Sequence, residues 1–376
     1  MYAKLDYLVL RGIMYGMATT NTETGAAENR APRLYPPPVL TSPDLDALIA
    51  DTEAEILRVI ERVQDERTQT LYEMVRYHLG LDHEGPRGKR LRPLLGLLAY
   101  ESLAGDHRMA LPGAAAVELG HNFSLVHDDI EDRDVERHHR ATLWMVFGVA
   151  QAINTGDTLF TLSRMALYRL RELGFSDAKV LQLMHLYDET CLALCEGQFM
   201  DIWSAEHDDR LSVDFYFDMI GRKTAALIAA SVQAGAMLAT DDEQVIEAYR
   251  GFGWSLGIAF QLNDDLLGIW GDAQATGKEP SDLAKHKKTL PVIYALERAP
   301  APDRERLRAV LNLAEPSSEE IAQGRAILDA CGAREYTRER ARAERDEALR
   351  RIESAGTVSA EALDRLRLIV VSAISA

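Results

Sequence analysis

Three aspartates, Asp128, Asp129 and Asp132, end an apolar stretch in the run HNFSLVHDDIED at 121–132. Carboxylates that are crowded at the end of a buried helix repel one another and are costly to bury without a cation. Residues 128 and 132 are one helical turn apart, so both side chains leave one face of the helix about 5–6 Å apart. Oxygen ligands of this kind suit Mg²⁺, which keeps several waters and takes one or two carboxylates together with substrate phosphate oxygens. This run therefore predicts a metal site at the end of a helix.

A second pair of acidic residues, Asp264 and Asp265, ends another apolar helical stretch in the run QLNDDLLG at 261–268. A single acidic pair is common on a solvated helix end and indicates little. Two pairs at the ends of apolar helices, with basic residues near both, favour a shared function. We expect the two acidic helix ends to lie on opposite sides of one cavity, with their carboxylates facing it.

Basic residues stand near both acidic runs although the chain as a whole is acidic. Lys89 and Arg92, in GKRLRP at 88–93, begin an apolar helix and are candidates for an anion site, because Arg suits bidentate contact with phosphate. The other basic groups are Arg137, His138, His139 and Arg140 after the first run, and Lys278, Lys285, Lys287 and Lys288 after the second. Taken singly, each is explained as well by an ordinary surface position. Together they supply the charge balance that a magnesium-bridged diphosphate needs.

The charge of the whole chain limits its partners. A net charge of −17, from 59 acidic and 42 basic residues, argues against nucleic acid or an anionic membrane as a general partner. The cysteines Cys191, Cys195 and Cys331 make no disulfide framework and indicate a reducing, cytoplasmic location. Cys191 and Cys195 share a helical face, but no further Cys or His completes a metal site, so we interpret both as buried structural residues.

The first forty residues differ from the rest. Residues 5–17 are apolar in patches, too short for a membrane span and without a convincing signal-peptide cleavage site. Residues 18–38 are rich in Thr, Asn, Glu, Gly and Pro. We expect 1–40 to be a disordered or extended lead-in, and 41–376 to be one domain. Met17 is a candidate for the natural start of translation.

Apolar residues recur at helical spacing along the rest of the chain, and no convincing alternating strand is found. A periodic segment opens at Ser42-Pro43, an N-cap followed by a proline at the first helical position, and runs to about Gly80. Further helices are predicted at 91–104, 109–132, 143–173, 176–205, 211–239, 242–270, 288–298, 303–313, 317–330 and 334–376. Helices of this length predict an all-α protein, a single large antiparallel bundle with its active site in a central cavity.

The combination of motifs resembles the trans-isoprenyl diphosphate synthase, or polyprenyl synthetase, family from about residue 45 to 370. The matching runs are GKRLRP at 88–93, HNFSLVHDDIED at 121–132, EGQ at 196–198, KT at 223–224, FQLNDD at 260–265, and TGK followed by KKTLP within 276–291. The resemblance implies the isoprenoid synthase fold, a homodimer, and Mg²⁺-dependent condensation of an allylic diphosphate with isopentenyl diphosphate, with three Mg²⁺ ions per site.

The resemblance also implies roles for individual residues. Asp128, Asp129 and Asp132 match the first metal motif, and Asp264 and Asp265 match the second. Lys89, Arg92, His121 and His138 match the site for isopentenyl diphosphate. Arg137, Lys223, Thr224, Gln261, Lys278 and Lys287 match contacts to the allylic diphosphate, and Gln198 matches a position near the reacting centre. For Gln198 and Thr224, a satisfied polar group between helices is an equal alternative.

Three residues depart from the family pattern. Gly268 stands where many members have a third Asp of the second motif. His138 stands where the family has the second of two consecutive arginines, and a largely uncharged histidine would weaken binding of isopentenyl diphosphate there. His286 replaces a glycine before Lys287.

Phe123 and Ser124 are the candidates for controlling product length. In this family, the residues five and four positions before the first Asp form the floor of the product cavity. A large residue followed by a small one resembles geranylgeranyl diphosphate synthases. The alternative is that Phe123 is simply a core residue.

Two other functions fit parts of the pattern. A class I terpene cyclase on the same fold ionises a long diphosphate but does not bind isopentenyl diphosphate; Lys89, Arg92 and His121 argue against it, and His138 favours it. A non-catalytic partner subunit of a prenyl synthase would be expected to lose an acidic motif, and both are present. A nucleophilic Ser or Cys is not required, because the reaction ionises a carbon–oxygen bond whose leaving group is stabilised by metal ions and cations.

Overall fold

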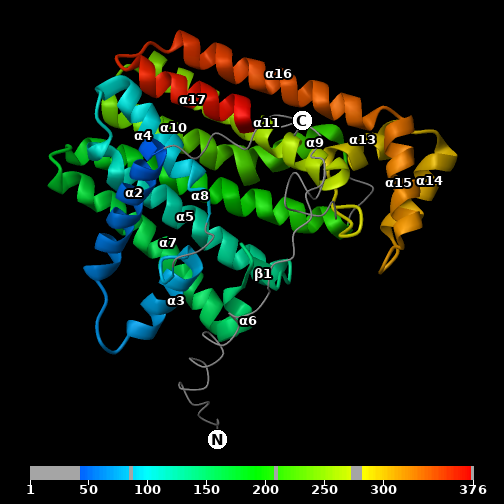
Figure 1. Ribbon diagram of the computed structural model, residues 1–376, viewed down its shortest axis with the longest axis horizontal. Helices are drawn as coiled ribbons and strands as arrows, with labels where there is room; N and C mark the ends of the chain where they lie inside the picture. The colour runs from blue at the N-terminus through cyan, green and yellow to red at the C-terminus, as the bar shows by residue number, and fades with distance from the viewer. Residues whose placement is uncertain (1–42, 84–87, 207–210, 272–281, 374–376) are drawn as a thin grey trace, which may run out of the picture. The chain divides into compact units, whose positions relative to one another are not determined.

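The computed structural model describes residues 43–83, 88–206, 211–271 and 282–373 (Figure 1). The predicted lead-in at 1–40, the candidate start Met17 and the predicted ligand Lys278 lie outside these ranges. Within them the chain is helical except for its connections and a two-residue ladder in which β1 (Glu136–Arg137) pairs antiparallel with β2 (Arg140–Ala141). The predicted all-α class is confirmed.

The helices follow one another with short connections. None of those described is both long and apolar enough to cross a membrane. They are α2 (Pro43–Glu61), α3 (Gln69–Leu79), α4 (Leu91–Ala104), the 3₁₀ turn η1 (Arg108–Ala110), α5 (Leu111–Glu131), α6 (Leu143–Phe147), α7 (Val149–Glu172), α8 (Asp177–Glu206), α9 (Val213–Ile220), the π-helical turn η3 (Gly221–Ala225), α10 (Ala226–Ala239), α11 (Glu243–Trp270), α13 (Leu290–Arg298), α14 (Ala301–Leu311), α15 (Ser318–Ala330), α16 (Ala333–Ser354) and α17 (Ala360–Ala373).

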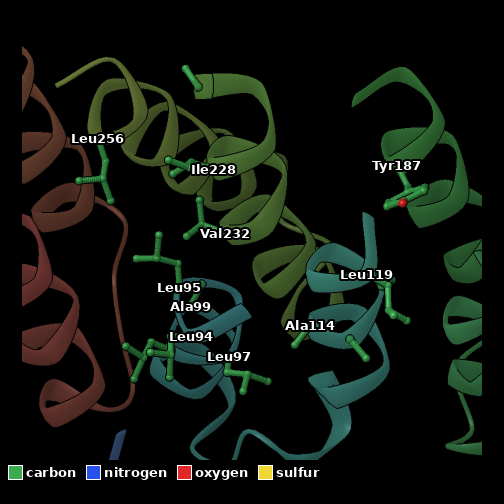
Figure 2. Close-up of a cluster of buried hydrophobic side chains, with 14 of the residues drawn as sticks. Leu94, Leu95, Leu97, Ala99, Ala114, Leu119, Tyr187, Ile228, Val232 and Leu256 are labelled. Atoms are coloured by element: carbon green, nitrogen blue, oxygen red, sulfur yellow. The ribbon is translucent and has the colours of Figure 1, made fainter. Parts of the chain in front are cut away.

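The core lies where α4, α5, α10 and α11 pack together, with α7 against α5 and α16 against α11. Figure 2 shows part of it, including Leu95 of α4, Leu119 of α5 and Val232 of α10, all fully buried. Small residues bring α4 and α10 close, since a Cβ added to Gly235 would lie 2.2 Å from the carbonyl oxygen of Gly96. This close packing fixes the helices whose ends carry the acidic motifs.

Three predicted helices are interrupted. The segment 143–173 breaks at Gly148, whose φ of 81° favours glycine. The segment 334–376 breaks between α16 and α17, where Gly356 has a φ of 72°. From Val213 to Ala239 the chain stays helical, but the π-helical turn η3 interrupts the α-helix, and turns of this kind are frequent at functional sites. The prediction of single helices was wrong at these three places.

The buried environment predicted for the two neighbouring cysteines holds for only one of them. Cys191 is buried on α8, whereas Cys195, one turn later, is exposed. The prediction for Cys195 was wrong, because the buried side of α8 here carries Cys191 and Leu194 and leaves Cys195 at the surface.

Candidate active site

The first acidic motif stands at the end of α5, the helix that packs between α4 and α7. Asp129 is 2% exposed, Asp128 is partly buried, and Asp132 is exposed at the C-cap. The pKa of Asp128 is raised to about 7, chiefly by burial; Lys223 opposes the shift, and the negative charges of Asp132 and Glu131 contribute to it. The carboxylates are therefore costly to ionise unless a cation approaches.

Arg137 of the β1–β2 ladder covers this end of α5. Its guanidinium contacts Oδ1 of Asp129 at 2.7 Å. The other carboxylate oxygen, Oδ2, is buried without a hydrogen-bond partner among the described residues. Asp129 therefore orders Arg137 and keeps one oxygen for a further ligand.

The second acidic motif stands near the end of α11, and its two aspartates differ. Asp264 is exposed, whereas Asp265 is 3% exposed. Asp265 accepts hydrogen bonds from the hydroxyl of Tyr216, from the backbone N–H of Leu290 at 2.8 Å, and from Gln261 at 3.1 Å. Its pKa is raised to about 7, chiefly by burial, with these hydrogen bonds opposing the shift and Asp264 adding to it. These hydrogen bonds hold Asp265 in place at the helix end, and Asp264 is the more exposed of the two. The metal-binding role of both aspartates stays a prediction.

Charge interactions extend from one motif to the other. The ammonium of Lys223, on η3, lies 2.5 Å from the carboxylate of Asp201 on α8. Burial opposes the charge of Lys223, but the carboxylates of Asp201, Asp128 and Asp132 raise its pKa. On the other side, burial and the charges of Asp265, Asp264 and Asp201 raise the pKa of Tyr216 well above its usual range. Lys223, Asp201 and Tyr216 thus link the end of α5 to the end of α11.

The segments that follow the two motifs also contact each other. Lys285, which follows the second motif, lies 3.3 Å from Oδ1 of Asp134, which follows the first. Both motifs therefore belong to one region of the fold, as the sequence predicts. The cavity expected between them stays a prediction.

The π-helical turn presents Lys223 and Thr224 because α8 approaches it closely. A Cβ on Gly197 would lie 2.4 Å from the backbone nitrogen of Lys223, so only glycine allows this contact. Thr224 donates to Gln261 at 2.9 Å, and Gln198 donates to Glu131 at 2.7 Å. Residues of the EGQ, KT and FQLNDD runs thus lie close to the two acidic motifs.

Asp201 is a residue that the sequence analysis missed. It follows Gln198 by three positions and therefore lies on the same face of α8. That spacing from the EGQ run was the available signal.

The predicted anion site is basic and partly assembled. Arg92 contacts Nε2 of His121 at 3.0 Å. Burial lowers the pKa of Arg92 to about 10, and burial together with Arg92 and Arg137 lowers the pKa of His121. Lys89 is exposed nearby in sequence. A Cβ added to Gly88 would lie 3.6 Å from Nε2 of His138, so this imidazole faces the GKRLRP run.

Arg90, between the two predicted ligands, has a different role. It is 4% exposed and contacts Glu118 at 2.8 Å, Glu53 at 3.2 Å and the carbonyl of Leu79. This buried arrangement ties α2, α3 and α5 together at the start of α4. Arg90 is therefore structural, whereas Lys89 and Arg92 remain available for an anion.

Lys287 lies 3.8 Å from Oδ1 of Asp282, and its side chain is about half exposed. The preceding residue, His286, has a φ of 57°, in the left-handed region that favours glycine. This explains why a glycine suits that position, and the histidine there is held in a strained backbone conformation.

Phe123 and Ser124 point in different directions from α5. Phe123 is 8% exposed and packs edge-to-face on Phe160 of α7, with ring centroids 5.1 Å apart. Ser124 donates to the carbonyl of His121. Their predicted role in product length stays a prediction.

The acidic residues fit Mg²⁺ in a particular way. No three His, Cys, Asp or Glu side chains of the described residues converge to hold a metal ion by themselves. Asp128, Asp132 and Asp264 instead offer separate carboxylates, and burial raises the pKa of both Asp128 and Asp132. Separate oxygen ligands suit an ion that keeps its waters and takes the rest of its ligands from a phosphorylated substrate.

Comparison with known proteins agrees with this arrangement. The family model described as "Polyprenyl synthetase" matches residues 68–328. A geranylgeranyl diphosphate synthase of Mycobacterium tuberculosis is 40% identical over 257 residues, which are 66% of this chain and 72% of that protein. A (2E,6E)-farnesyl diphosphate synthase of the same organism is 37% identical over 298 residues, 76% of this chain and 81% of that protein. The crystal structure of a polyprenyl synthetase from Streptomyces coelicolor A3(2) superposes with a TM-score of 0.78 at 34% identity, covering 88% of this chain and 98% of that one.

Proposed function

Since the chain belongs to the polyprenyl synthetase family and is a trans-prenyl diphosphate synthase, we propose that it condenses an allylic diphosphate with isopentenyl diphosphate to give geranylgeranyl diphosphate. Three contacts support the proposal: Lys223 pairs with Asp201, Tyr216 donates to Asp265 of the second motif, and Lys285 pairs with Asp134, which follows the first motif. Two separated carboxylate groups with a cation between them suit one diphosphate held from both sides.

The allylic diphosphate binds between the motifs. Asp128, Asp129, Asp132, Asp264 and Asp265 would hold Mg²⁺, with three ions per site proposed, and Mg²⁺ would supply Lewis-acid stabilisation of the leaving diphosphate. Lys223 adds a positive charge, and Arg137, Lys278 and Lys287 complete the set of basic contacts. Gln261 and Thr224 fix one another at 2.9 Å and so keep the end of α11 in register with η3.

Isopentenyl diphosphate binds at the basic run formed by Lys89, Arg92, His121 and His138. The allylic carbon–oxygen bond breaks, and the electron pair leaves with the diphosphate. The isopentenyl double bond then forms the new carbon–carbon bond, and a proton leaves to the departing diphosphate. The protein positions the two substrates, stabilises the negative charge of the leaving diphosphate, and keeps water away from the allylic carbocation.

Product length is proposed to be set beneath the first motif. Phe123 lies five residues before Asp128, and its ring is braced by Phe160. A chain that grows along α5 from the metal site would stop at this pair of rings. Geranylgeranyl and farnesyl diphosphate synthases are both among the relatives, so the support for the longer product is the pair of rings at Phe123 and Phe160.

A homodimer is also proposed. Exposed large apolar residues gather on α7 and α8, which contact each other. On α7 they are Val149, Ile153 and Tyr168, and on α8 they are Leu181, Leu192, Phe199 and Ile202. A face of this kind suits a second copy of the chain. A cytoplasmic location is proposed, supported by three free cysteines and no disulfide.

Product analysis tests the proposal. The purified protein is incubated with Mg²⁺ and dimethylallyl, geranyl or farnesyl diphosphate, each with and without labelled isopentenyl diphosphate. The expected result is labelled geranylgeranyl diphosphate only when both substrates are present. Hydrocarbon released from farnesyl diphosphate alone would instead show a terpene cyclase, the reading that His138 favours. A protein that consumes neither substrate would be a non-catalytic subunit.

A further inference from the structure

Tyr187 of α8 reaches towards α5 and fills a place that only glycine leaves open (Figure 2). A Cβ built on Gly120 of α5 would lie 2.2 Å from the Tyr187 hydroxyl oxygen and 2.9 Å from two carbons of its ring. The hydroxyl donates to Oγ of Ser163 on α7 at 2.5 Å, and Tyr187 is 5% exposed. Tyr187 therefore closes the space where α5, α7 and α8 meet.

This place lies one helical turn beyond the pair of rings formed by Phe123 and Phe160. Gly120 precedes Phe123 by three residues on α5, and Ser163 follows Phe160 by three residues on α7, so each lies one turn from its ring on the same face. The Ser163 hydroxyl also donates to the carbonyl of Phe160 at 2.5 Å. Both steps lead away from the first acidic motif, because residue numbers fall along α5 as they rise along α7. Tyr187 thus lies directly behind the ring pair as seen from that motif.

The step between the two layers is about the length of one isoprene unit. Three residues of α-helix advance about 4.5 Å. One isoprene unit adds four carbon–carbon bonds along the chain, which span roughly 5 Å. A chain that grows along α5 and passes the first pair of rings would therefore meet Tyr187 about one unit later.

The Tyr187 ring is held in one position. Burial, chiefly, raises the pKa of Tyr187 well above its usual range, so the hydroxyl keeps its proton and remains the donor to Ser163. Cys191, one turn further along α8, is also 5% exposed and covers the ring from its own helix. A ring that is packed on its faces and fixed at its hydroxyl does not swing aside easily, so it is a firm stop for an apolar chain.

We propose that Tyr187 is a second determinant of product length, which stops the growing chain about one isoprene unit beyond the Phe123–Phe160 pair. The inference rests on the proposed function. It assigns the role to a residue of α8 that lies outside every motif found in the sequence. The alternative is that Tyr187 only joins α8 to α7.

The test measures product length in a protein from which the first ring has been removed. Each variant is incubated with Mg²⁺, farnesyl diphosphate and labelled isopentenyl diphosphate, and the dephosphorylated products are separated by chromatography and weighed by mass spectrometry. Phe123→Ala should give a product about one isoprene unit longer than that of the wild type. Phe123→Ala combined with Tyr187→Ala should add at least one further unit, because both layers are then open.

Matched variants separate the ring of Tyr187 from its other contacts. Phe123→Ala with Tyr187→Phe keeps the ring, loses the hydroxyl, and should give the same product as Phe123→Ala alone. Tyr249→Ala is the control for loss of a buried tyrosine, since the Tyr249 hydroxyl contacts Ser102 at 2.5 Å in another part of the core. In the Phe123→Ala background it should leave product length unchanged. Thermal unfolding shows which variants are folded, and Tyr187→Val replaces Tyr187→Ala if the alanine variant is not.

Three outcomes would overturn the inference. The first is a double variant of Phe123 and Tyr187 whose products match those of Phe123→Ala alone. The second is a Phe123→Ala variant that already makes products several units longer, since Tyr187 would then not stop the chain. The third is a longer product from Tyr187→Ala alone, because the first pair of rings should still stop the chain there. A wild type that makes no longer diphosphate from the two substrates would instead overturn the proposed function itself.

Discussion

Lys223 and Asp201 form an ion pair, 2.5 Å from nitrogen to oxygen, between the π-helical turn η3 and α8. The negative charges of Asp128 and Asp132 of the first motif also raise the pKa of this ammonium. Lys223 thus offsets several carboxylates at once, and its position depends on the close contact between η3 and Gly197.

Replacing Lys223 with Gln should raise the KM for the allylic diphosphate by about tenfold or more, because a hydrogen bond to a charged group contributes about 1.5–3 kcal/mol. The KM for isopentenyl diphosphate should change little. Lys179→Gln is the matched control, since Lys179 of α8 also makes a 2.5 Å ion pair, with Asp241. Equal effects on both substrates would argue that Lys223 acts only through the general stability of the site.

Tyr216→Phe removes the hydroxyl that donates to Asp265 and leaves a buried carboxylate with one hydrogen bond fewer. We expect a loss of about 1–3 kcal/mol in the free energy of unfolding, measured with urea. Tyr249→Phe is the control, because Tyr249 is equally buried and its hydroxyl contacts Ser102 at 2.5 Å. Both variants should lose stability, but only Tyr216→Phe should raise the Mg²⁺ concentration needed for half-maximal activity. An unchanged Mg²⁺ requirement would limit Tyr216 to a structural role.

The helical class and the order of helices could be predicted because apolar spacing reports which face of a helix is buried. The interruptions at Gly148, at Gly356 and at the π-helical turn η3 could not be predicted in this way. Gly148 and Gly356 break their helices by taking positive φ, yet other glycines, such as Gly197 and Gly257, lie inside helices and serve close packing. Spacing alone cannot distinguish a glycine that ends a helix from one that lets two helices touch.

The sequence predicts which residue types form the site, but not which residues of a motif are buried in structural contacts and which face a ligand. The sequence treats Asp264 and Asp265 alike, whereas Asp265 is buried and accepts three hydrogen bonds and Asp264 is exposed. Within the GKRLRP run, Arg90 forms buried ion pairs with Glu53 and Glu118 and serves the fold rather than anion binding. These distinctions depend on residues that are distant along the chain, so they appear only once the helices are packed.

Phe123→Ala should lengthen the product, because it removes the ring that packs on Phe160 beneath the metal site. It should also cost about 3–5 kcal/mol of stability, as large-to-small changes in a core do. Phe252→Ala, which removes a fully buried ring from α11, should cost a similar amount without changing the product. Chromatography of the dephosphorylated products decides, and an unchanged chain length for Phe123→Ala would remove Phe123 from this role.

His78 should make the protein less stable in mild acid. Its pKa is lowered to about 3, chiefly by burial, with Arg137, Arg90 and His138 contributing to the shift. The unfolded chain takes up a proton near pH 6.5 and the folded chain does not, so stability present above that pH is lost as the pH falls towards 3. At pH 5.5 the loss should be about 1.4 kcal/mol, and His78→Gln should abolish this part of the pH dependence.

The control for this effect is His185→Gln, since the His185 side chain is 75% exposed on α8. The free energy of unfolding is measured with urea at pH 7.5 and pH 5.5 for the wild type and both variants. The same difference between the two pH values in wild type and His78→Gln would show that His78 is not the group responsible.

His138→Arg should strengthen the binding of isopentenyl diphosphate. The His138 imidazole faces the GKRLRP run, and its pKa is lowered by burial and by Arg137, Arg90 and the neighbouring His139, while Glu118 opposes the shift. It is therefore uncharged at neutral pH, whereas an arginine keeps its charge. The KM for isopentenyl diphosphate should fall by about fivefold to tenfold at pH 8, in keeping with one added charged contact. The gain should shrink as the pH falls and the histidine takes up a proton. His139→Arg adds the same charge at an exposed side chain beside Glu136 and should leave that KM nearly unchanged. If both variants lowered it equally, the effect would be general attraction of an anion, and His138 would not be a contact in the site.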